Sequence, residues 1–142
     1  MTTLLDTNVL SELLRPQPSA SVLAWFAAQR PETLFVSALT QAEMQLGARL
    51  LPAGKRRTSI ETALRAMFEE DFAGRVLPFD TLAVPPYVEI VSARRAAGRP
   101  ISQFDAQIGA IARLHGALLA TRNEADFDAC GVRVINPWRH AA

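Results

Sequence analysis

The chain of 142 residues contains one cysteine, Cys130, and only two histidines, His115 and His140. A single cysteine cannot form an internal disulfide, and it leaves no cysteine cluster for a structural metal site. The two histidines lie far apart in the sequence and lack the short spacing that is typical of zinc ligands. These absences exclude disulfide-stabilised folds and zinc-binding modules.

Long apolar runs and targeting signals are missing as well. The best candidate for a membrane helix, residues 108–122, is interrupted by Arg113 and His115 and falls short of the about 18 apolar residues required. The first residues contain no basic segment followed by an apolar one, as a secretory signal would. We therefore expect a cytoplasmic protein without membrane contact.

Lysine is almost absent, since Lys55 stands against 14 arginines, and 14 acidic residues bring the net charge to +1. This balance neither favours nor excludes a nucleic-acid partner. An arginine side chain can bind a phosphate through two parallel hydrogen bonds, whereas lysine acts as a point charge. A bias in codon composition is the simpler explanation of the arginine excess.

Apolar residues follow a pattern of short strands alternating with helices. A length of 142 residues with 49% hydrophobic residues suits one compact domain, residues 1–142. The expected strands are residues 2–5, 33–37, 75–79, 117–121 and 132–136, and the expected helices are 7–14, 19–30, 40–51, 55–73, 81–97 and 102–115. This alternation predicts an α/β fold, an α/β/α sandwich around a central, mostly parallel five-stranded sheet.

Acidic and amide side chains follow several of the expected strands. Asp6 ends the first strand, Glu43 lies shortly after the second, and Asp105 opens the helix before the fourth. Asn123 and Asp126 follow the fourth strand. Strand ends on one side of a parallel sheet share a rim, and ligands bind there, near the point where the strand order reverses. We therefore expect these side chains to converge.

Converging carboxylates require either protons or a cation between them. Two carboxylates about 4 Å apart repel each other by roughly 4 kcal/mol at an effective dielectric constant of 20. Oxygen ligands without cysteine or histidine favour Mg²⁺ or Mn²⁺ over Zn²⁺. Such an ion can activate a water and stabilise charge on a phosphoryl group, so the pattern is typical of metal-dependent phosphodiester hydrolysis.

Helix capping is a second explanation of the same acids. An aspartate before a helix is a good N-cap, which fits Asp6. Thr40 with Glu43, and Ser102 with Asp105, match the capping box or its acidic relative, and the helix dipole favours acids at helix starts. Spacing alone leaves capping and metal binding open. The two are compatible, because oxygens not used in capping remain free.

Four segments resemble a known family: "LLDTNVLSELLRP", "VSALTQAEMQLG", "ISQFDAQIGAIARLHGALLATRNEADF" and "VRVINPW". They are similar to the PIN domain, and more closely to the VapC-type toxins of bacterial type II toxin–antitoxin systems. The resemblance extends from Leu4 to Trp138. It implies a PIN-like fold and a toxin that acts as a Mg²⁺-dependent endoribonuclease, with Mn²⁺ as a substitute, hydrolysing RNA phosphodiester bonds.

The same resemblance implies roles for particular residues. Asp6, Glu43 and Asp105 match the three acids of the family's metal site. Asn123 stands where many relatives carry aspartate after a Thr-Arg pair, and we expect it to hold a water or the scissile phosphate. Asp126 matches a second acidic position, and we expect it to act through water or by contacting the residues that bind the metal.

Three polar residues accompany these acids. Thr121 matches a hydroxyl position near the site, although an ordinary threonine at a strand end is an equal alternative. Thr7 and Asn8 are expected to order the metal site through hydrogen bonds, with simple turn formation beside Asp6 as the alternative.

The family resemblance also implies partners: a cognate VapB-type antitoxin, an RNA substrate, a second copy in a homodimer, and DNA only indirectly through the antitoxin. Basic residues that could contact the RNA backbone are Arg15, Arg49, Lys55, Arg56, Arg57, Arg94, Arg95 and Arg99. Leucines that fill either the core or an antitoxin groove are Leu13, Leu14, Leu46, Leu50 and Leu51. Residues that serve either the core or a dimer face are Trp25, Phe26, Met44 and Trp138.

Two features depart from the expected pattern. Pro85 and Pro86 lie where we expect an uninterrupted helix start, and they should delay or kink that helix. Gly109 lies within a helix, where alanine would be about 1 kcal/mol more favourable. A close contact with a strand or a second subunit would explain this glycine.

Three other functions are alternatives to the nuclease. A haloacid-dehalogenase-type phosphatase needs a second aspartate two positions after the first, where this chain has Asn8. An aspartic protease would carry DTG rather than DTN, on a β-rich chain. A catalytically inert PIN-like module that binds RNA or a protein partner is kept open by Asn123, and loss of Mg²⁺ binding on substitution of Asp6 or Asp105 would separate it from an enzyme.

Overall fold

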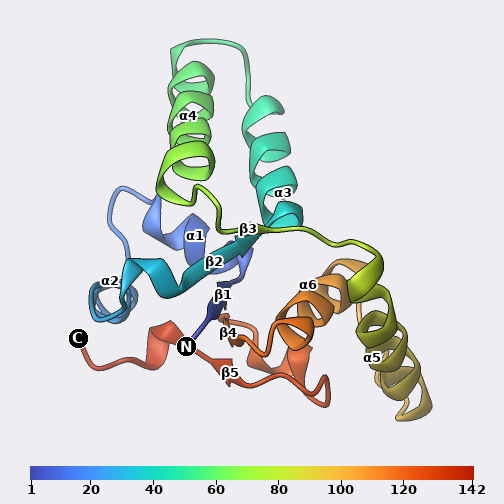
Figure 1. Ribbon diagram of the computed structural model, residues 1–142. Coiled ribbons are helices and arrows are strands. Elements are labelled where there is room, and N and C mark those ends of the chain that lie inside the picture. Colours follow the sequence, from blue (N-terminus) through green and yellow to red (C-terminus); the bar gives the residue numbers. More distant parts are fainter.

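Five short strands form a sheet at the centre of the computed structural model, which describes residues 1–142. The strands are β1 Thr3–Leu5, β2 Leu34–Ser37, β3 Val76–Leu77, β4 Leu118–Ala120 and β5 Val134–Ile135. They lie in the order β3-β2-β1-β4-β5, and every pair of neighbours is parallel. The expected five-stranded sheet is confirmed, and it is parallel throughout (Figure 1).

The helices lie close to the expected ranges: α1 Thr7–Leu13, α2 Ala20–Ala27, α3 Ala38–Arg49, α4 Lys55–Ala66, α5 Val84–Ala96 and α6 Gln103–Leu114. Short helical turns join them: η1 Pro31–Thr33, η2 Met67–Asp71, η3 Thr81–Ala83, η4 Glu124–Phe127 and η5 Pro137–Arg139. Figure 1 shows α3 and α4 side by side as a hairpin that extends away from the sheet. None of the helices combines the length and the apolar character needed to cross a membrane.

Strand β1 separates two apolar cores. Leu4 and Leu5 are both fully buried, and successive side chains of a strand point to opposite faces. Leu4 belongs to the core that contains Ile108 of α6, whereas Leu5 belongs to the core that contains Trp25 of α2. Burial on both faces explains why the strand is continuously apolar, as expected for the middle layer of a sandwich.

The helix expected over residues 55–73 ends in a different way. α4 gives way to the wider π-helical turn η2, in which the Phe72 N–H donates to the Met67 carbonyl oxygen at 2.9 Å. Leu64, Phe68 and Phe72 are buried in the same core. Residues spaced four apart drift around an α-helix, which has 3.6 residues per turn. The wider turn reduces this drift and keeps Phe72 directed at the core.

The delay expected from Pro85 and Pro86 is confirmed, because the helix expected from residue 81 begins as α5 only at Val84. The 3₁₀ turn η3 leads directly into α5, and both prolines lie in the first turn of that helix. The N–H groups of a first helical turn have no acceptor within the helix, so a proline at this position removes no helical hydrogen bond. The two prolines therefore fit the start of α5.

Gly109 lies where α6 packs against α5, and replacement by alanine is expected to stabilise the protein by about 1 kcal/mol. An added Cβ would lie 3.5 Å from Ile90 Cδ1 and 3.8 Å from Phe127 Cδ1, which are ordinary van der Waals distances. The gain comes from the higher helix propensity of alanine. Thermal unfolding of Gly109→Ala measures it, and a lower melting temperature would show that the helix–helix contact admits no methyl group.

Large apolar side chains divide between the core and the surface. Those expected to serve the core or a dimer face belong to the core: Trp25 is buried, and Phe26, Met44 and Trp138 pack against it. Several leucines with two expected roles are exposed instead: Leu14 by 48%, Leu46 by 59% and Leu50 by 74%. The exposed leucines do not fill the core of this chain and remain available to a partner.

Candidate active site

The strand order reverses at β1, which has β2 on one side and β4 on the other. In an open parallel sheet the crevice for a ligand forms at the carboxyl ends of the two strands that flank such a reversal. Asp6 follows β1 and Thr121 follows β4 directly. The Asp6 N–H donates to the Ala120 carbonyl oxygen at 2.9 Å, so the two strand ends are held together.

Asp6 is buried, with 5% of its surface exposed, and both carboxylate oxygens are engaged. Oδ1 accepts from the Thr7 N–H at 2.8 Å and caps α1. Oδ2 accepts from the Thr121 hydroxyl at 2.8 Å and from the Asn8 amide at 3.4 Å. The capping role expected for Asp6 is confirmed, and it coexists with a second set of contacts across the crevice.

Asn8 and Thr121 connect the start of α1 with the segment after β4. The Asn8 amide also donates to Thr121 Oγ1 at 3.3 Å, and Asn8 Oδ1 accepts from the Arg122 N–H at 3.2 Å. Thr121 Oγ1 accepts from the Asn123 N–H at 3.1 Å. These bonds fix the orientation of Asp6, and they place Asn123 beside it on the rim.

Glu43 does not belong to a capping box. Ser37 caps α3 by accepting from the Thr40 N–H at 3.0 Å, and the helix begins at Ala38, so Glu43 lies in its second turn. The Thr40 hydroxyl is hydrogen-bonded at 3.0 Å to that of Thr7. The capping explanation is wrong for Glu43. It is correct for α6, where Ser102 accepts from the Asp105 N–H at 3.1 Å.

The acids of the rim influence one another electrostatically. Burial raises the pKa of Asp6, and the Asp105 and Glu43 carboxylates raise it further, against the effect of two hydrogen bonds. Burial also raises the pKa of Asp105, with added contributions from Asp126 and Glu43. None of these four carboxylates forms an ion pair with a basic side chain. The acids of the rim therefore have no ion-pair partner within this chain, although the distant positive charge of Arg94 partly offsets the raised pKa of Asp105.

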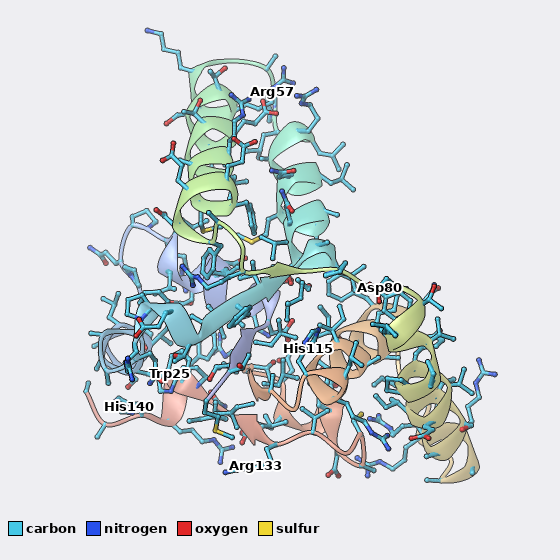
Figure 2. The ribbon with its side chains drawn as sticks, viewed as in Figure 1. Trp25, Arg57, Asp80, His115, Arg133 and His140 are labelled. Carbon is cyan, nitrogen blue, oxygen red and sulfur yellow. The ribbon has the colours of Figure 1, made fainter.

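The acids share the rim without forming a closed cage. No three acidic, histidine or cysteine side chains lie close enough together to ligate one ion. Mg²⁺ keeps several waters and often binds proteins through one or two carboxylates, so an open arrangement is compatible with it. The donor set consists of unpaired carboxylates with one buried member, and it fits a hard divalent cation. His115 and His140 lie in different parts of the molecule (Figure 2).

Arg94 has a different role from the expected RNA contact. It is 5% exposed, and its guanidinium donates to the carbonyl oxygens of Arg99 (2.6 Å), Asp126 (2.9 Å) and Asp128 (3.0 Å). These bonds tie the end of α5 to the η4 segment, which carries Asp126. The expectation is wrong because the side chain faces inward and its charge is already satisfied.

Four other arginines expected to contact RNA are paired with acids. The pairs are Arg15 with Glu12 at 3.2 Å, Arg49 with Glu61 at 2.9 Å, Arg57 with Glu61 at 3.6 Å, and Arg99 with Asp128 at 3.0 Å. The hydroxyls of Ser37 and Thr40, which were not predicted from the sequence, belong to the hydrogen-bond network that reaches Thr7 beside the site. Their signal in the sequence was a polar pair directly after a buried strand.

Comparison with known proteins agrees with this geometry. Residues 3–131 match the family described as the PIN domain. The chain belongs to the PIN domain family. It is 44% identical to VapC ribonuclease Y4jK of Sinorhizobium fredii over 137 residues, which cover 96% of this chain and 98% of the relative. It is 42% identical to Toxin FitB of Neisseria gonorrhoeae over 135 residues, covering 95% and 97% respectively.

Solved structures show the same relationship. The structure of FitAB bound to an IR36 DNA fragment matches this PIN domain with a TM-score of 0.93 and 40% identity, covering 99% of each chain. The resemblance of the four segments to PIN-domain toxins of the VapC type is therefore confirmed. In this PIN domain the rim at the carboxyl ends of β1 and β4, where the buried Asp6 lies, is the candidate active site.

Proposed function

We propose that this PIN domain is the toxin of a type II toxin–antitoxin pair and a Mg²⁺-dependent endoribonuclease that hydrolyses RNA phosphodiester bonds. The observation that carries the proposal is the buried, unpaired Asp6 carboxylate at the strand-order reversal, fixed by Thr121 and facing acids from other segments. Relatives named VapC ribonuclease and Toxin FitB support the same conclusion.

Some residues of the site would bind the metal ion, and others orient those ligands or contact the substrate. Asp6, Glu43 and Asp105 would hold the ion, one or two of them directly and the rest through waters that the ion retains. Bound Mg²⁺, or Mn²⁺ in its place, would stabilise negative charge on the phosphoryl oxygens and lower the pKa of a water. Thr121 keeps the Asp6 carboxylate in one orientation. Asn123 and Asp126 lie exposed on the rim, where an amide can donate to a phosphate oxygen and a carboxylate can accept a proton from water.

An antitoxin of the VapB type is the expected protein partner, and the FitAB structure with a DNA fragment supports a toxin–antitoxin complex that binds DNA. We expect DNA contact only indirectly, through the antitoxin. A groove of about 580 Å³ runs from Thr7 and Glu43 past Leu14 and Leu51. An apolar groove that begins at the acids suits a peptide that covers the active site. Homodimerisation is proposed from the family.

The test is cleavage of an end-labelled RNA pool by purified, antitoxin-free protein, with Mg²⁺ or with EDTA. We expect cutting with Mg²⁺ only, and its loss in Glu43→Gln and Asp105→Asn. Glu70→Gln is the matched control, because Glu70 is an exposed, unpaired acid on η2 and should be dispensable. Metal binding without cutting of any RNA would favour the inert binding module, and cutting in EDTA would contradict the metal-dependent mechanism.

A further inference from the structure

Most arginines of this chain already have partners, and Arg122 is an exception beside the active site. Ion pairs or carbonyl oxygens engage Arg15, Arg30, Arg49, Arg57, Arg75, Arg94, Arg99, Arg113 and Arg139. The charged group of Arg122 makes no ion pair or hydrogen bond, and the residue is exposed. It directly follows Thr121, whose hydroxyl binds Asp6.

Both the backbone and the side chain of Arg122 are held in place. Its N–H donates to Asn8 Oδ1 at 3.2 Å, and its guanidinium carbon lies 5.1 Å from the centre of the Trp138 ring. A guanidinium over an indole face is attracted by the ring and keeps its N–H edges free. Arg122 is therefore preordered without being neutralised.

The tryptophan beneath it is equally fixed. The backbone N–H of Trp138 donates to Asn136 Oδ1 at 2.9 Å, and the Trp138 side chain packs against the core that contains Trp25. The Asn136 amide donates to Glu124 at 3.1 Å. The "NPW" segment thus provides a rigid support for Arg122, a role that its position at the end of the chain did not indicate.

The nearby Glu12 carboxylate forms no ion pair with the Arg122 guanidinium. Glu12 accepts from the Ser19 N–H at 2.8 Å and from Arg15 at 3.2 Å, so its oxygens are already used. The Ser19 N–H is the main cause that lowers the pKa of Glu12, with smaller contributions from Arg15 and Arg122. The positive charge of Arg122 is therefore unpaired and exposed to solvent, and it lies next to the acidic side chains of the rim.

We propose that Arg122 is a substrate-binding residue, whose guanidinium, supported by Trp138, binds an RNA backbone phosphate beside the one that is cleaved. The inference rests on the proposed ribonuclease function. A phosphate matches the planar pair of donors that stacking leaves free. Acids at the rim repel the RNA backbone, and a fixed cation next to them offsets that repulsion. The contact reads the backbone and not the bases.

The experiment measures binding of a fluorescein-labelled, mixed-sequence single-stranded RNA at low salt, by fluorescence anisotropy, in an Asp105→Asn background that prevents cleavage. Arg122→Ala should raise the Kd by about tenfold. It should also reduce the slope of log K against log salt by about 0.7, the value for one phosphate contact on a single strand. Arg122→Lys should keep the slope and lose part of the affinity, because it keeps the charge without the planar fork.

Arg133→Ala is the matched control, since Arg133 is also exposed and unpaired but lies before β5, at the opposite end of the sheet from the active site (Figure 2). Equal effects of Arg122→Ala and Arg133→Ala would overturn the proposal. Unchanged RNA binding with a weaker antitoxin complex would also overturn it and assign Arg122 to the protein partner. Failure of the ribonuclease function itself is distinguishable, because it appears as absent cleavage by the wild-type chain while this binding assay remains valid.

Discussion

Asp6→Asn is expected to reduce RNA cleavage by about 1,000-fold, equivalent to about 4 kcal/mol of transition-state stabilisation. Asparagine is as good an N-cap as aspartate, so α1 should still form. The substitution removes the charge of the one buried acid in the crevice and leaves the side-chain volume nearly unchanged. Rates measured on the same RNA, together with Mg²⁺ affinity by calorimetry, check this expectation.

The same variant should alter how stability depends on pH in the metal-free protein. Burial raises the pKa of Asp6 in the folded chain above its usual 3.8. Below pH 3.8 the acid is protonated in folded and unfolded chains, and its contribution to stability is fully present. That contribution is lost as the pH rises through the folded-state pKa. Wild-type protein should therefore lose melting temperature relative to Asp6→Asn between pH 3.8 and neutrality.

Asp80→Asn is the matched control for both measurements. Asp80 caps the turn η3 in the same manner, with its carboxylate accepting from the Leu82 N–H at 3.1 Å, and it is exposed near the start of α5 (Figure 2). Cleavage and pH dependence should match the wild type. Parallel melting curves of wild type and Asp6→Asn across this pH range would contradict a raised pKa for Asp6.

Arg94→Leu is expected to destabilise the chain by about 3 kcal/mol, which lowers the melting temperature by about 10 °C in a protein of this size. Removal of the guanidinium leaves the carbonyl oxygens of Arg99, Asp126 and Asp128 without their donor. Arg94→Lys should restore only a part of the loss, because one ammonium group cannot reach all three carbonyls in the same geometry.

The affinity for Mg²⁺ should also fall in Arg94→Leu. The variant lacks the hydrogen bonds from Arg94 that hold the η4 segment, with Asp126, against α5. Arg95→Leu is the control, because Arg95 is the next residue on the same helix and is exposed. A surface change of that kind usually stays within about 0.5 kcal/mol. Equal stability of the two leucine variants would show that water replaces the buried arginine without cost.

Local patterns made the sheet and its acidic rim predictable. Leu4 and Leu5 run directly into Asp6, and a short apolar run that ends in an acid indicates both a buried strand and the edge where it stops. A second apolar run, residues 117–120, indicated the strand that ends at Thr121, whereas the role of the Thr121 hydroxyl came from the family resemblance. Parallel pairing then brought the two strand ends together, although they lie far apart in the chain.

Contacts between distant segments could not be predicted in this way. Arg94 looks like any exposed arginine on an amphipathic helix, and its burial depends on carbonyl oxygens 32 and 34 positions further along the chain. The stacking of Arg122 on Trp138 also depends on the packing of the C-terminal turn. No periodicity in the sequence encodes either contact.

The hydrogen bond between Asp6 and Thr121 spans 115 positions of the chain, and this separation affects when activity can arise during protein synthesis. Ribosomes add about 5–20 residues per second, and the first acid emerges long before its partner. Until β4 is made, β1 can pair only with β2, and Asp6 lacks the hydroxyl that orients it. An unfinished or prematurely terminated chain therefore has no complete crevice. Under the proposed function, a cell is exposed to nuclease activity only after translation of nearly the whole chain.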